Sequence, residues 1–272
     1  MKKALINLTM IVGIIAFIGA CKSDDDSSTA ATTASCAGVS GWTEATSCSG
    51  TASGSITGID NLTFSGSYSQ NNIAAYLNRG VDNSTGCVDN TTMVSGFSIG
   101  STSAPTGTNS MIWEWVVTSS SSIAQNYKFY SDTSCQTEIA TLTLAYTDFT
   151  IGDNVTGLSS SAGSTNFLQS TATKVSYAQS CTGMKASTDA GATFLTAAFG
   201  SAGVSPTVGT THTCSVGGDT TNAFMKLDNE STVPALYGAI NGVGDNGTTF
   251  LHWDDAATTD WTSGVDTLMT LP

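Results

Sequence analysis

The chain alternates apolar and polar residues at every second position over most of its length after Gly41. Trp113, Trp115 and Val117 belong to one such series, and a run of four serines separates it from the next. Because successive side chains of a β-strand point to opposite faces, this period of two predicts strands with one apolar face. The expected strands cover residues 56–64, 73–81, 91–99, 112–117, 123–129, 141–147, 166–177, 223–227, 235–241 and 248–253.

One segment departs from the β pattern. Residues 187–202 are rich in alanine, and their bulky apolar residues recur at the spacing of one helix face. The residues of this face are Phe194, Leu195, Ala198 and Phe199. The pattern therefore predicts one short helix within a chain of strands.

Asp-Asn pairs mark the expected turns between strands. Both residues bond to their own backbone and tolerate the left-handed conformation that tight turns require. Calcium binding is the alternative use of these acids, but the EF-hand pattern is absent, which favours turns. The pairs occur at 60–61, 82–83, 89–90, 153–154, 228–229 and 245–246, the last followed by a glycine that strengthens the hairpin signal.

Strands joined by short turns predict an all-β fold. The preferred architecture is an antiparallel up-and-down β-barrel of about eight to ten strands with one short helix, since a closed barrel leaves no strand edge exposed. A two-sheet β-sandwich is the alternative, because the period of two is the same in both architectures.

Residues 1–20 have the form of a bacterial export signal. Two lysines precede an apolar run over residues 4–20, which is short for a stable membrane span. The run ends in Ile18-Gly19-Ala20-Cys21, which resembles the lipobox of bacterial lipoproteins. The resemblance implies cleavage before Cys21 and attachment of a lipid to its thiol, which anchors the protein to a membrane. An ordinary secretory signal followed by a chance cysteine is the alternative.

Residues 21–35 are expected to form a tether between this lipid and a single domain over residues 36–272. The segment is rich in serine, threonine and alanine, a composition typical of flexible linkers. Its acidic run, Asp24 to Asp26, is similar to the surface-export signals of some bacterial lipoproteins, and a solvated tether explains it equally well. The expected location is the outer membrane of the bacterial cell envelope, with the domain at the cell surface if the acidic run acts as such a signal.

Six cysteines follow the tether. An even number in an exported chain predicts three disulfides, and the lack of Cys-x-x-Cys spacing argues against a metal site. We prefer the pair Cys181–Cys214, because the segment between these two residues has the character of a single insertion. The other cysteines, whose pairing stays open, are Cys36, Cys48, Cys87 and Cys135.

The charged residues limit the classes of partner that the protein is expected to bind. Only 11% of the 272 residues are charged, with 21 acidic against 8 basic residues and a formal net charge of −13. Since nucleic-acid binding needs clustered lysine and arginine to neutralise phosphates, we expect no nucleic-acid partner. Serine and threonine together contribute 81 residues, so hydroxyl groups supply much of the polar surface.

A hairpin motif resembles a pattern of lipocalin-like bacterial lipoproteins. The run Tyr130-Ser131-Asp132-Thr133-Ser134-Cys135 matches their Tyr-x-Asp-x-x-Cys hairpin, and it leads into a strand that closes on Gly152. Gly41-Trp42 followed by Cys48 is similar to their opening motif. The resemblance implies a barrel that holds a small ligand in its interior.

No arrangement of catalytic residues stands out. Gly96-Phe97-Ser98-Ile99-Gly100 matches the G-x-S-x-G pattern of serine hydrolases, but that motif requires a strand, a sharp turn and a long helix, which the following residues up to Pro105 cannot start. A triad of Ser98, His252 and Asp254 is the corresponding alternative. Chance explains the match better, so we expect no catalytic residues, no metal and no cofactor.

Binding is the expected function. Six aromatic residues on predicted strands are candidates to line an apolar pocket inside the barrel, with a small hydrophobic molecule as the ligand. The candidates are Trp113, Trp115, Tyr127, Phe129, Tyr146 and Trp253. The alternatives are that these rings fill a solid core, and that the domain is an adhesion module that binds an extracellular protein or glycan through its loops. A serine hydrolase is the third hypothesis.

Overall fold

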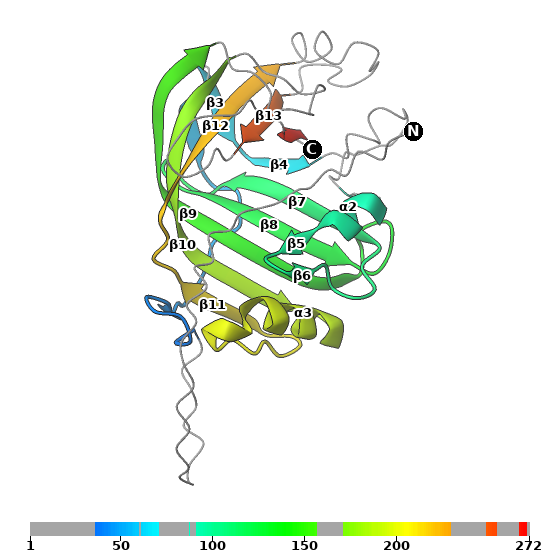
Figure 1. Cartoon of the computed structure of the whole chain (residues 1–272). Helices are drawn as coiled ribbons and strands as arrows, with labels where there is room; N and C mark the ends of the chain where they lie inside the picture. Colours follow the sequence, from blue (N-terminus) through cyan, green and yellow to red (C-terminus); the bar gives the residue numbers. More distant parts are fainter. Residues whose placement is uncertain are drawn as a thin grey trace.

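The computed structural model describes residues 36–59, 61–70, 87, 91–156, 171–229, 249–254 and 267–270. This part of the chain is mostly β, with antiparallel strands and few helices (Figure 1). Its elements, in chain order, are β1 (Thr43–Glu44), β2 (Ser55–Ile59), β3 (Leu62–Ser65), β4 (Ser67–Gln70), α2 (Thr91–Gly96), β5 (Ser98–Ile99), β6 (Thr102–Ser103), β7 (Ser110–Val117), β8 (Ile123–Tyr130), β9 (Glu138–Thr156), β10 (Thr171–Ala186), α3 (Asp189–Phe199), the 3₁₀ turn η1 (Gly200–Ala202), β11 (Thr211–Ser215), β12 (Thr220–Asn229), β13 (Thr249–Asp254) and β14 (Thr267–Thr270).

Ten of the described strands form one sheet. They follow the order β1-β11-β10-β12-β13-β14-β4-β7-β8-β9, and β9 pairs in addition with β10. Every pairing between these strands is antiparallel. The hairpins β2–β3 and β5–β6 each form a separate two-stranded sheet. The expectation of an antiparallel β fold is therefore confirmed for this part of the chain.

The alternation of side chains explains why β7 and β8 form the centre of the core. Trp113 lies opposite Tyr127 and Met111 lies opposite Phe129, and opposed residues of an antiparallel pair project to the same face. All four side chains are at most 3% exposed. The intervening residues, Glu114 among them, project to the other face. Both strands are predicted by the period of two, and the structure confirms them.

α3 confirms the helix expected within residues 187–202. Its N-cap is Thr188, whose hydroxyl oxygen accepts a hydrogen bond from the backbone N–H of Gly191 at 3.2 Å. Its buried side chains include Phe194, Leu195 and Phe199. Glycine is required at position 191, because a Cβ atom there would overlap the carbonyl oxygen of Ile139 in β9. The helix thus lies against the end of the sheet where β9 starts and β10 ends, which we call the α3 end (Figure 1).

Residues 45–54, which we call the strap, cross the outer face of the sheet, opposite to the core side of β7 and β8. The carbonyl oxygen of Gly50 accepts a hydrogen bond from Asn126 Nδ2 in β8 at 2.8 Å, and the N–H of Ser53 donates to the carbonyl oxygen of Val117 in β7 at 3.1 Å. A Cβ atom at Gly50 would overlap the side-chain oxygen of Asn126. Glycine therefore lets the strap lie directly on the sheet.

Three disulfides confirm the expectation from the cysteine count. They pair Cys36 with Cys214, Cys48 with Cys181, and Cys87 with Cys135. The expected pair Cys181–Cys214 is wrong. In the ladder between β10 and β11, Cys181 lies opposite Ser215, whereas Cys214 lies opposite Thr182. The two sulfur atoms therefore project to opposite faces of the sheet and cannot bond to each other.

Two of the expected strands have a different structure. Residues 56–64 form the hairpin of β2 and β3, and its turn contains Asn61 with a φ of 62°. The turn preference of the Asp-Asn pair outweighs the alternation on either side of it. Residues 91–99 form the short helix α2 followed by β5. Their buried residues Val94 and Phe97 are three positions apart, a spacing that suits a helical turn.

The turns expected at 153–154 and 228–229 are also wrong. Residues 153–154 lie within β9, which continues past Gly152 to Thr156, and residues 228–229 lie within β12, where they pair with β13. Thr173 of β10 donates its hydroxyl hydrogen to Asn154 Oδ1 at 2.7 Å, so the amide finds its partner across the ladder instead of in a local turn. The expected strands at 73–81 and 235–241, and the Asp-Asn turns at 82–83, 89–90 and 245–246, lie outside the described residues.

We expect Gly191→Ala to destabilise the domain. The added methyl group would collide with the carbonyl of Ile139 and push α3 off the sheet, which lowers the free energy of unfolding by about 1–3 kcal/mol. Gly200→Ala is the matched control, because a Cβ atom there meets only the methyl group of Thr196 at 3.8 Å and should be neutral or slightly stabilising. Urea denaturation of both variants measures the difference. Equal midpoints would show that the close approach of α3 does not matter.

Candidate functional site

The six aromatic candidates lie on four strands of the sheet. Trp113 and Trp115 lie in β7, Tyr127 and Phe129 in β8, Tyr146 in β9 and Trp253 in β13. The first four side chains are buried, at 2% exposure or less. Tyr146 is partly buried and packs against the same cluster. The side chain of Trp253 lies outside the described part of the structure.

The candidate rings contact one another. The rings of Trp113 and Tyr127 stack at a centroid distance of 5.6 Å, and those of Trp115 and Tyr146 lie 5.8 Å apart at a tilt of 35°. Stacked and tilted contacts at these distances are favourable geometries for aromatic pairs. The structure thus joins five of the six candidates in one packed cluster, which we call the aromatic core.

Further rings of the aromatic core were not among the candidates. Among them are Phe97, Phe194 and Tyr177. The ring of Phe97 lies 5.3 Å from that of Tyr127 and 4.9 Å from that of Phe129, and Phe194 of α3 approaches Phe129 to 5.2 Å. Phe194 and Tyr177 belong to an expected helix and an expected strand, so the sequence carried a signal for them. Phe97 follows α2, in a segment that the sequence predicts to be a strand. The local pattern therefore did not indicate that its ring lies in the aromatic core.

Gln125 is a polar residue inside the aromatic core. Its side chain is 2% exposed, and its Oε1 accepts hydrogen bonds from the hydroxyl groups of Tyr127 at 3.0 Å and Tyr146 at 3.2 Å. Two donors occupy both lone pairs of an amide oxygen. A polar atom in an apolar site can orient a ligand, but here the tyrosines of the core itself satisfy it.

Two pockets open on the surface of the described residues. One, of about 280 Å³, lies between α3 and loop 102–106, a segment that begins with the two residues of β6. The other, of about 210 Å³, lies on the outer face of β9, β10 and β12. None of the five described candidate side chains lines either pocket, and both are below the roughly 300 Å³ at which ligand pockets begin. We call the second one the outer pocket. It is lined by Thr150, Ile151, Gly152, Asp153, Lys174, Val175, Ser176 and Asn222.

A polar cluster lies on the outer face of the sheet, next to the strap. Glu114 projects from β7 away from the aromatic core, and its Oε1 accepts hydrogen bonds from Lys128 Nζ at 2.6 Å and Asn126 Nδ2 at 3.0 Å. The hydroxyl group of Ser67 donates to Oε2 at 2.6 Å. Asn126 also donates to the carbonyl oxygen of Gly50. The carboxylate therefore connects β4, β7 and β8, and through Asn126 it connects them to the strap.

The carboxyl group of Glu114 is kept ionised. Burial by itself raises its pKa, but the hydrogen bonds from Lys128, Ser67 and Asn126, together with the positive charge of Lys128, outweigh burial and hold the pKa below its ordinary value. Three donors thus share this charge, and they hold together the cluster that joins the strap to the sheet.

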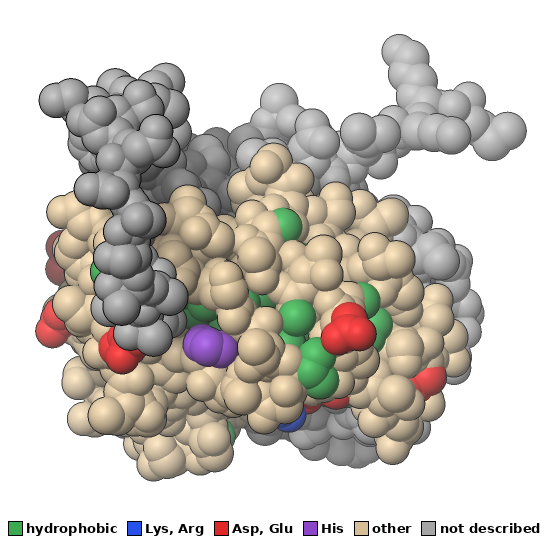
Figure 2. All heavy atoms as spheres, turned by 90° about the horizontal axis from the view of Figure 1, so that it is seen from below, with side chains coloured by type: hydrophobic (Ala, Val, Ile, Leu, Met, Phe, Trp, Pro, Cys, Tyr) green, Lys and Arg blue, Asp and Glu red, His purple; other side chains and the backbone are tan. Residues whose placement is uncertain are grey.

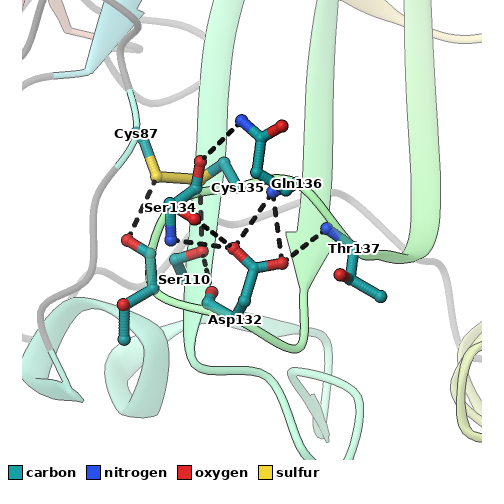
Figure 3. Close-up of a disulfide and its surroundings, with 8 residues drawn as sticks. Cys87, Ser110, Asp132, Ser134, Cys135, Gln136 and Thr137 are labelled. Carbon is teal, nitrogen blue, oxygen red and sulfur yellow. Dashed lines mark hydrogen bonds between the residues drawn. A yellow bond between two sulfur atoms is a disulfide. The ribbon is translucent and has the colours of Figure 1, made fainter.

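The hairpin motif of residues 130–135 owes its shape to Asp132 (Figure 3). Its carboxylate accepts hydrogen bonds from three backbone N–H groups of the same turn, those of Ser134, Gln136 and Thr137. These bonds, above all the one from Gln136, hold the pKa of Asp132 well below its usual range. Cys135 lies within this turn at a φ of 55°, and it is bonded to Cys87. The spacing from Asp132 to Cys135 therefore allows Asp132 to bond the turn and Cys135 to form the disulfide.

The serine-hydrolase motif lacks its structural context. Ser98 lies in β5, which follows helix α2 and pairs with β6, where Ser103 is opposite Ser98. The hydrolase motif needs a strand, a sharp turn and then a helix. The side chains of His252 and Asp254 lie outside the described residues. Within the part of the chain that is described, no group of three or more His, Cys, Asp or Glu side chains could hold a metal ion.

No family model matches the chain, and no curated protein matches it. Among the residues that the structure describes, no helix is long and apolar enough to cross a bilayer. What the chain does must therefore be inferred from the geometry of its own residues.

We expect Glu114→Gln to destabilise the domain by about 1–3 kcal/mol at neutral pH, because Lys128 and Ser67 lose a charged partner. In the wild type, the lowered pKa of Glu114 contributes stability that is present above about pH 5 and is lost as the pH falls through the folded-state pKa. The variant should therefore lose less of its free energy of unfolding between about pH 7 and pH 3. Urea denaturation across this range measures both effects.

Glu44→Gln is the control for this series. Glu44 lies exposed in β1, and its substitution should change stability by about 0.5 kcal/mol or less at any pH in the range. If the free energy of unfolding of Glu114→Gln depended on pH as that of the wild type does, the Glu114 carboxylate would not join the strap to the sheet as we infer.

Proposed function

We propose that the chain is a lipid-anchored, non-catalytic binding protein of the bacterial cell envelope, which recognises an extracellular protein or glycan with its outer surface. The packed aromatic core is the observation that carries this proposal. Four of the candidate pocket residues are at most 2% exposed, and their rings are engaged with other rings of the core. A hydrophobic ligand would have to displace these rings, so recognition at the outside of the sheet is the better hypothesis.

Within this proposal eight strands of the ten-stranded sheet close as an up-and-down barrel around the aromatic core. The additional pairing of β9 with β10 supports closure, because it joins the last strand in the sheet order to a strand near the beginning. A barrel of about eight strands has an interior that side chains can fill. The strands of the proposed ring are β10, β12, β13, β14, β4, β7, β8 and β9.

The outer pocket supports recognition at the surface. Ile151 is large and apolar, yet it is 37% exposed there. The hydroxyl groups of Thr150 and Ser176 lie 2.6 Å apart in the same pocket, beside the opposite charges of Asp153 and Lys174. The pocket thus offers a polar partner one apolar contact together with hydrogen-bond donors and acceptors of both charges.

We expect Cys21→Ser to release the protein from the membrane, because a hydroxyl group cannot form the thioether to the lipid. In a Gram-negative host, the wild-type chain should be found in the membrane fraction and carry the mass of a lipid, and the variant should lose both properties. Ser23→Ala is the matched control and should behave as the wild type. A Cys21→Ser protein that stays in the membrane fraction with an unchanged mass would contradict the lipid anchor.

We expect Trp115→Ala to lower the free energy of unfolding by about 3–5 kcal/mol, the loss typical of a fully packed aromatic side chain. A tryptophan that lined an open pocket would cost much less. Ile151→Ser in the outer pocket is the comparison and should cost about 0.5 kcal/mol or less. Urea denaturation measures both. A small loss at Trp115, together with a hydrophobic molecule extracted from protein purified from its native host, would favour an interior ligand instead.

A further inference from the structure

We propose that the α3 end of the domain is held next to the membrane, and that the opposite end, where β9 and β10 are paired at Thr156 and Thr171, points away from it. This orientation rests on the lipid anchor at Cys21 proposed above. It makes the bilayer surface the neighbour of one end of the domain, and it leaves the outer pocket accessible to a partner.

The chain enters the domain at the α3 end and is fixed there. Cys36 is bonded to Cys214 of β11, and both residues are fully buried. The N–H of Gly38 donates to the carbonyl oxygen of Ala202 in η1 at 3.0 Å, and a Cβ atom at Gly38 would overlap the carbonyl oxygen of Ser201. The first described residues are therefore part of the packed domain, and a tether that ends at Cys36 acts on the α3 end.

The tether is short compared with the sheet. Residues 22–35 can span at most about 50 Å, the fully extended length of 14 residues. β9 has 19 residues, which gives a contour of about 60 Å at the rise of a β-strand. It starts at the α3 end and runs to its pairing with the start of β10 (Figure 1). The far end is therefore, on average, more distant from the bilayer.

The described surface of the α3 end has no cluster of basic side chains that could bind anionic lipid headgroups. Figure 2, which views the molecule from below, shows acidic side chains, a histidine and a few hydrophobic side chains among mostly uncharged groups. Asp189 and Glu44 are exposed, and Lys185 at the end of β10 pairs with Glu138 at 3.0 Å. Anionic headgroups attract clusters of lysine and arginine, which the described residues do not provide here. The tether, and not electrostatic attraction, therefore sets the orientation.

The two surface pockets have different surroundings in this orientation. The pocket between loop 102–106 and α3 lies at the end that faces the membrane. The outer pocket lies further along the sheet, because Ile151 is separated from Ile139, against which α3 packs, by about 40 Å of β9. A partner that approaches from the medium meets the outer pocket first.

Energy transfer from the protein to the membrane tests the orientation. The full lipidated chain is reconstituted in phosphatidylcholine vesicles that contain an acceptor-labelled lipid. A fluorescent noncanonical amino acid, which leaves the disulfides intact, replaces Ser205 or Thr156. Both residues are exposed, Ser205 between η1 and β11 and Thr156 at the end of β9. Transfer should be at least about twofold more efficient from Ser205, because β9 separates the sites by tens of ångströms. Equal efficiencies would overturn the orientation.

Vesicle flotation separates a failure of the orientation from a failure of the anchor. Wild-type protein should float with the vesicles and Cys21→Ser should not. A wild-type chain that does not float overturns both proposals, whereas a chain that floats with equal transfer from the two sites overturns the orientation alone. A second copy of residues 22–35 inserted after Ser35 lengthens the tether, and it should lower the transfer from Ser205 without changing flotation.

Discussion

The aromatic core forms because neighbouring strands project rings to the same side of the sheet at every second residue. Trp113 of β7 lies opposite Tyr127 of β8, and the ring of Trp115 packs against that of Tyr146 in β9. A buried ring removes on the order of 150–250 Å² from water, so these rings are the largest local source of hydrophobic stabilisation. Two segments outside the main strands pack against these rings with a ring of their own. α3 contributes Phe194, and the segment after α2 contributes Phe97.

The same alternation places polar side chains on the opposite face, where the strap would otherwise bury them without partners. Asn126 resolves this by accepting a hydrogen bond from Thr143 at 2.8 Å while donating to Glu114 and to the carbonyl of Gly50. A buried polar group without such partners is costly. Hydroxyl and amide groups can satisfy one another at short range without bringing further charges into the site. This agrees with a chain in which 11% of the residues are charged.

Features that depend on local pattern could be predicted from the sequence, and features that depend on register could not. The period of two predicted β7 and β8, and the helical spacing of apolar residues predicted α3. The pair Cys181–Cys214 failed because the face of each sulfur atom depends on how β10 is aligned with β11. The six aromatic candidates meet a different limit. An open pocket and a filled core both need rings on the inward face, and the rings of Phe97 and Phe194 that pack against them come from other segments of the chain.

The order of the disulfides along the chain has a consequence for how the domain acquires them. Cys87–Cys135 lies inside Cys48–Cys181, which lies inside Cys36–Cys214, so the three bonds are nested. In a chain that enters an oxidising compartment N-terminus first, three cysteines arrive before any of their partners. From Cys135 onward, each arriving cysteine bonds to the most recent one that is still free. With this connectivity, the three native disulfides can form in the order in which the cysteines are exported, and no bond already made has to be broken.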